Sequence, residues 1–66
     1  MSIAKIIEIS AESPESFEAA VRHGIDRAAK TVHNIQSAWI KEQQVIIESD
    51  RIVGFRVDLK ITFLLD

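Results

Sequence analysis

The stretch that decides the fold runs from Arg51 to Leu65 and reads Arg-Ile-Val-Gly-Phe-Arg-Val-Asp-Leu-Lys-Ile-Thr-Phe-Leu-Leu. Every odd position from Val53 onward is apolar, and the even positions from Gly54 to Thr62 are glycine or polar. A period of two over this length indicates a long β-strand with one wholly apolar face. That face must be covered by another element of the chain.

The residues before this strand predict a hairpin. A second extended stretch covers Ile35 to Glu48, and Ser49-Asp50 forms the turn between the two strands. Asp is a good turn former, but the lack of glycine argues against a tight primed turn. Glu42, Gln43 and Gln44 interrupt the alternation of the second strand, which a β-bulge would explain because one extra residue switches faces.

Before the hairpin, the spacing of the apolar residues changes to that of a helix. Ser13 is a good N-cap and Pro14 suits the first helical position, so the helix is expected from about Pro14 to about Val32. Apolar residues recur there every three or four positions. Gly24 lies on this apolar stripe, and we expect it to allow close backbone approach to the sheet.

The chain opens with an isoleucine-rich run, Ser2 to Ser10, that favours one more strand. The predicted class is therefore α+β, with order β-α-β-β and a three-stranded sheet wrapped around one helix in a single domain, residues 1–66. The first strand joins the last either antiparallel or through a longer crossover. Exposed sheet edges invite pairing with other subunits.

Size and composition narrow the functional classes. A chain of 66 residues buries little surface, and it has no cysteine for disulfides or thiolate metal sites. We therefore expect an obligate homo-oligomer. A net charge of −2 without a basic stripe argues against nucleic-acid binding, and no apolar run approaches a membrane span. The expectation is a soluble cytoplasmic protein without a signal peptide.

Trp39 is the single tryptophan, and its neighbours are small or polar. It is either a platform for a planar ligand or an anchor in a subunit interface. Ser37 shares its strand face. A turn centred on Ser49-Asp50 would place Trp39 opposite Lys60 and Arg56 opposite Gln43.

The other polar residues also leave two interpretations. Arg56 either binds an anionic ligand group or pairs with Glu42 or with Asp58 of a neighbouring subunit. Gln43, which the predicted register places opposite Arg56, either faces a ligand cavity or joins an inter-subunit hydrogen-bond patch. Four acidic residues are candidate oxygen ligands for a hard cation such as Ca²⁺. They are Glu8, Glu12, Glu15 and Asp58. In the alternative interpretation they are solvated surface acids. No nucleophile–base pair or phosphate-binding loop stands out, so no enzyme activity is expected.

Four segments together resemble the dodecin family over nearly the whole chain. They are Ala4 to Ser10, Ser13 to Ala20, Ile25 to Val32 and Phe55 to Leu65. The resemblance implies a β-α-β-β protomer that assembles into a hollow dodecamer of cubic symmetry and has no catalytic activity. In the dodecins known as flavoproteins, paired flavins stack between symmetry-related tryptophans, and a glutamine on the last strand binds the ring edge.

In an ungapped alignment, Ser37 stands where the flavin-stacking tryptophan is found, with Trp39 two residues later, and Arg56 stands at the glutamine position. The resemblance thus implies a shell that stores or sequesters a small ligand, first of all riboflavin or FMN, at Trp39, Ser37, Arg56 and Gln43. The alternative is a variant that binds a cation such as Ca²⁺, or that only assembles.

Overall fold

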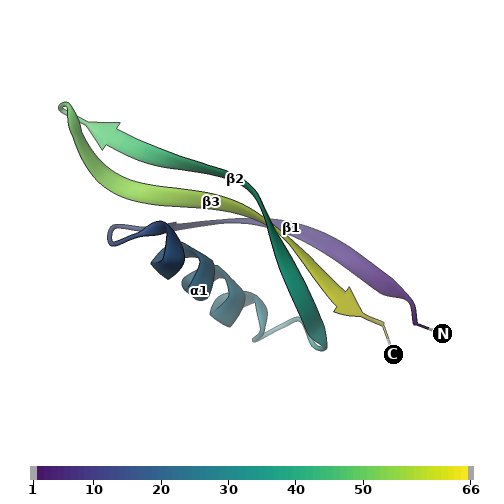
Figure 1. Ribbon diagram of the computed structural model, residues 1–66. Helices are drawn as coiled ribbons and strands as arrows, with labels where there is room; N and C mark the ends of the chain where they lie inside the picture. The colour runs from purple at the N-terminus through teal and green to yellow at the C-terminus, as the bar shows by residue number, and fades with distance from the viewer. Residues whose placement is uncertain (1, 66) are drawn as a thin grey trace.

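The computed structural model describes residues 2–65. Strand β1 (Ala4–Ser13) is followed by helix α1 (Phe17–Ala28), strand β2 (Ile35–Glu48) and strand β3 (Arg51–Leu64). The strands form one sheet in the order β1-β3-β2, and both pairings are antiparallel. Helix α1 lies against one face of this sheet (Figure 1). The predicted β-α-β-β protomer is confirmed, and β1 lies antiparallel beside β3.

The core lies between α1 and the odd-numbered face of β3. Val57, Leu59 and Ile61 are fully buried there, together with Ala20 of the helix. Gly24 allows the close approach that its position predicted: a Cβ atom on it would lie 3.0 Å from Ala11 Cβ and 3.3 Å from Leu59 Cδ1. The odd-numbered apolar face therefore points to the helix, and the even-numbered face is left open.

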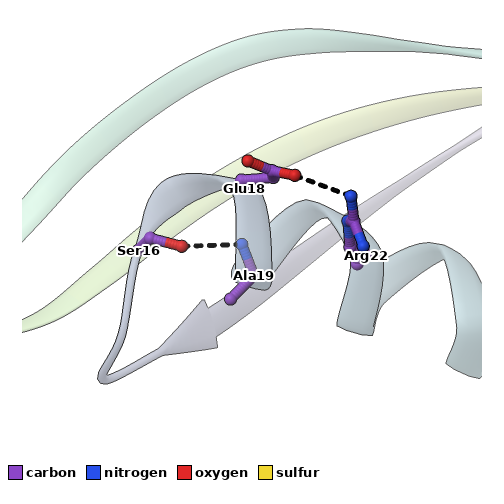
Figure 2. A network of polar contacts seen from close by, with 4 residues as sticks. All are labelled: Ser16, Glu18, Ala19 and Arg22. Carbon is purple, nitrogen blue, oxygen red and sulfur yellow. Dashed lines mark hydrogen bonds and ion pairs between the residues drawn. The ribbon is translucent and has the colours of Figure 1, made fainter.

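The helix begins later than predicted. Its N-cap is Ser16, whose Oγ accepts a hydrogen bond from the Ala19 amide at 3.0 Å (Figure 2), so the expected cap at Ser13 is wrong. Ser13 instead ends β1 opposite Phe55. The extended backbone that proline favours at Ser13 is used for pairing in the sheet, and Ser13 Oγ accepts a hydrogen bond from the Glu15 amide at 3.0 Å.

The helix also ends earlier than predicted, at Ala28 and not near Val32. A hydrogen-bonded turn continues the chain to Val32, whose amide donates to the Ala28 carbonyl at 2.9 Å. Of the opposite-charge pairs spaced four residues apart on α1, Glu18 and Arg22 are joined at 2.7 Å (Figure 2). Both side chains are largely exposed, so this pair adds only a few tenths of a kcal/mol.

The hairpin between β2 and β3 is tighter than expected. Glu48 pairs with Arg51, which leaves Ser49 and Asp50 as a two-residue loop with φ of 51° and 62°. Positive φ at both central residues is the requirement of a type I′ turn, whose twist matches that of the strands. The expectation against a primed turn is wrong here, because the favourable strand geometry outweighs the cost of placing serine and aspartate in the left-handed region.

The predicted bulge in β2 is confirmed. Ile40 pairs with Leu59 and Glu42 with Asp58, so Lys41 is an extra residue in the ladder. The register also shifts between Ile35 and Ser37 and again near the hairpin, between Ile46 and Ile47. These shifts decide which β2 side chains meet the open face of β3.

Candidate functional site

The face of the sheet away from α1 carries the predicted site residues, and we call it the open face. Directly opposed residues in an antiparallel pair share a face, so the register assigns its members. Its polar and aromatic members are Glu8, Ser10 and Glu12 of β1, Ser37, Trp39, Glu42 and Gln44 of β2, and Arg56, Asp58, Lys60 and Thr62 of β3.

Trp39 is largely exposed to solvent on this face, with 71% of its surface accessible. It opposes Lys60, as predicted, and the Lys60 Nζ lies 5.9 Å from the centroid of the indole ring. Ser37 opposes Thr62 and is on the same face, also as predicted. The indole thus has a cation near it, a small hydroxyl residue two positions away, and a large area free for another flat group.

Arg56 is held between both neighbouring strands. Its Nε donates a hydrogen bond to Glu12 Oε1 at 2.7 Å, and its Nη1 donates to Gln44 Oε1 at 3.4 Å. Within this chain its carboxylate partner is therefore Glu12, not the Glu42 considered from the sequence.

The predicted pairing of Arg56 with Gln43 is wrong, because Val53 is an extra residue of β3 at the register shift between Ile46 and Ile47, so Gln44 stands opposite Arg56. The bulge at Lys41 then restores the register, which is why Trp39 still opposes Lys60. Gln43 opposes Val57 and so lies on the face that carries the helix. Gln44 takes its place beside Arg56. A bulge in β2 was expected from the polar run, but the further register shift near the hairpin, and hence the choice between two adjacent glutamines, was not readable from the pattern.

The acidic residues of the open face divide into two groups. Glu8 is paired with the bulge residue Lys41, 3.3 Å from its Nζ, and Glu12 is paired with Arg56. Glu42 and Asp58 directly oppose each other across β2 and β3. Like charges in this relation are unfavourable unless a cation or a polar group lies between them.

The remaining predicted oxygen ligand, Glu15, is not part of this arrangement, because it lies between β1 and α1. The two histidines are also outside it, since His23 is exposed on α1 and His33 lies between α1 and β2. Within residues 2–65, no group of three or more histidine, aspartate or glutamate side chains is close enough to hold a metal ion. In the same range no helix is long and apolar enough to span a bilayer.

One helix packed on a three-stranded antiparallel sheet, with an open polar face that presents an exposed indole, defines a small α+β protomer of the dodecin type. The chain belongs to the dodecin family, whose sequence model matches residues 3–66.

Individual relatives agree with this assignment. The chain is 33% identical over 63 residues to a calcium dodecin from Mycobacterium tuberculosis, which covers 96% of this chain and 89% of that protein. It superimposes on a dodecin from Streptomyces davaonensis with a TM-score of 0.94 and 31% identity, covering 98% of this chain and 96% of the other.

A third comparison concerns a calcium-chelating relative. The structure of the calcium dodecin from Mycobacterium tuberculosis, described as having a novel calcium-binding site, matches with a TM-score of 0.86 and 31% identity. The match covers 98% of this chain and 93% of that one.

Proposed function

We propose that this chain assembles into a hollow cytoplasmic dodecamer that binds and stores a small ligand without transforming it, and that the ligand is a flavin such as riboflavin or FMN. The observation that carries the proposal is the exposed indole of Trp39 on the open face. A flat aromatic ring presented to solvent favours stacking with a planar ligand.

The residues around Trp39 are compatible with an isoalloxazine ring, which has a flat apolar body and polar edges. Ser37 is small and leaves room on the same face, so the displaced Trp39 can offer the stacking surface. Arg56 and Gln44 supply hydrogen-bonding groups further along the face. In this proposal the site consists of Trp39, Ser37, Arg56 and Gln44, with a second copy of the chain closing it.

Fluorescence titration tests this proposal. Ligand-free protein is mixed with riboflavin and, separately, with FMN, and quenching of flavin emission is followed at micromolar concentrations. Binding should be lost in Trp39→Ala. The control Ile40→Ala removes a neighbouring exposed apolar side chain on the opposite sheet face and should bind normally. If the unaltered protein quenches neither flavin, the flavin proposal is wrong.

A second candidate ligand is Ca²⁺, favoured by the opposed carboxylates of Glu42 and Asp58. Carboxylate oxygens are the usual ligands of this hard cation. In a symmetric shell each carboxylate recurs around an axis, so oxygens from several subunits can meet. Because one relative is named a calcium dodecin, Ca²⁺ is the cation to test before other cations.

Calorimetric titration of chelator-treated protein with CaCl₂ tests the second candidate. Binding that is abolished in Glu42→Gln and Asp58→Asn would support it. Glu48→Gln, which removes one exposed carboxylate at the end of β2, is the control and should leave binding unchanged. Absence of any heat of binding in the unaltered protein would exclude this candidate.

A further inference from the structure

The end of the β2–β3 hairpin extends past the rest of the protomer. β1 pairs with β3 only as far as Ser13 opposite Phe55, whereas β2 and β3 stay paired up to Glu48 and Arg51 (Figure 1). We call residues 45–54 the arm. It is a two-stranded ribbon, and such ribbons are marginally stable without a partner surface.

The arm carries large apolar side chains that the protomer does not cover. Ile47 and Ile52 oppose each other across the two strands and are 59% and 58% exposed. Val45 and Val53 are exposed beside them. The turn at its end adds charge, with Glu48 and Asp50 against one cation, Arg51. An exposed apolar patch with a charged rim is typical of a protein–protein contact.

A groove whose apolar and basic side chains complement the apolar, acidic arm lies between β1 and α1. It measures about 860 Å³, and we call it the β1–α1 groove. Small or apolar residues form its floor, namely Ile9, Ala11, Gly24 and Ala28. Basic side chains line its rim, namely His23, Arg27 and Lys30. Glu12 also lines it, but its carboxylate is paired with Arg56.

We propose that the arm of one copy docks into the β1–α1 groove of a second copy. Ile47 and Ile52 would pack over the small residues Ala11, Gly24 and Ala28 of the groove. The acidic excess at the turn would meet Arg27 and Lys30 on the rim, so charge complementarity selects the orientation.

The contact requires two copies of the chain. The arm extends beyond Phe55, which packs on Phe17 at the start of α1, whereas the groove is lined by the C-terminal half of α1. A contact between two different surfaces is heterologous, and such contacts build closed rings when the rotation closes. The inference rests on the proposed assembly and names the surfaces that form it.

Cross-linking tests the contact directly, because the chain has no cysteine of its own. Ala28→Cys is combined with Ile47→Cys in one variant and with Ile52→Cys in another, and air oxidation joins two thiols into a disulfide. A ladder of covalently linked chains in a non-reducing gel is expected for at least one pair. Each single-cysteine variant is the control and should form no ladder beyond a dimer.

Charge reversal provides a second, independent test. Arg27→Glu with Lys30→Glu on the groove, or Glu48→Lys with Asp50→Lys on the arm, should each lower the assembled mass measured by light scattering. All four changes in one chain should restore it. Glu15→Lys with Glu18→Lys, which alters charge near the start of α1 outside the groove, should leave the mass unchanged.

The outcomes separate this inference from the proposed function. If the unaltered protein is a monomer by light scattering, the proposed shell itself is wrong, and this contact with it. If the unaltered protein assembles, but neither cysteine pair cross-links and the charge-reversed variants keep their mass, only the arm-to-groove contact is overturned. Loss of assembly that the fourfold variant does not restore likewise contradicts the pairing of these two surfaces.

Discussion

Arg56 donates a hydrogen bond from Nε to Glu12 Oε1 at 2.7 Å, across two strands whose residues are 44 positions apart in the sequence. The resemblance drawn from the sequence implies that Arg56 stands where a flavin-binding dodecin would have a glutamine. The guanidinium is engaged by Glu12 and Gln44, so it is positioned on the open face but not free to reorient.

Replacing Arg56 with Gln should strengthen flavin binding by about fivefold, because one added ligand hydrogen bond is worth about 1 kcal/mol. Stability should fall by at most about 1 kcal/mol, since the Arg56 and Glu12 side chains are 37% and 51% exposed. Flavin titration and urea denaturation at fixed protein concentration measure both effects. Arg22→Gln, which breaks only the exposed pair with Glu18, is the matched control and should not change flavin affinity.

The Lys60 ammonium and the Trp39 indole should be energetically coupled. At 5.9 Å from the ring centroid, the cation is near the outer limit of a cation–π contact, so a coupling of about 0.5 kcal/mol is expected. A double-mutant cycle of Lys60→Met and Trp39→Leu, read by urea denaturation, measures it. The parallel cycle with Ser37→Ala in place of Trp39→Leu should be additive. Additivity in both cycles would show that the contact contributes no stability.

Gly24→Ala should destabilise the protein even though alanine favours helices. The new methyl group would lie 3.0 Å from Ala11 Cβ, which cannot move without β1. Overpacking of this kind costs about 1–3 kcal/mol, more than the roughly 1 kcal/mol gained in helix propensity. Asp26→Ala, at an exposed position of the same helix, should instead raise stability by a few tenths of a kcal/mol. A Gly24→Ala protein more stable than the unaltered one would contradict the close helix–sheet approach.

Ser49→Asn should stabilise the hairpin. Ser49 has a φ of 51°, a region that asparagine tolerates better than serine, and the change keeps the charge of Asp50. We expect a gain of a few tenths to about 1 kcal/mol in the free energy of unfolding. Ser49→Val places a β-branched residue at the same positive φ and should lower it by about 1–2 kcal/mol. Equal stability of the two variants would be inconsistent with a type I′ turn.

Much of the fold could be predicted because its signals are local. The alternation after Val53 predicted a strand from Arg51 to Leu65, and β3 ends one residue earlier. Strand β2 has the predicted bounds, Ile35–Glu48. The start of α1 was predicted less well, because Ser13 and Ser16 both qualify as N-caps, and pairing of Ser13 with Phe55 in the sheet decides between them.

The sequence by itself determined the element order and the apolar face of β3, because side chains alternate strictly along a strand. It also placed Ser37 and Trp39 on one face, since they are two residues apart. Only the tertiary structure decided the neighbours of Arg56. Glu12 comes from a distant strand, and the register shift between Ile46 and Ile47 sets Gln44, not Gln43, opposite Arg56. A shift of one residue exchanges the faces of a strand, and no local pattern records where that shift occurs.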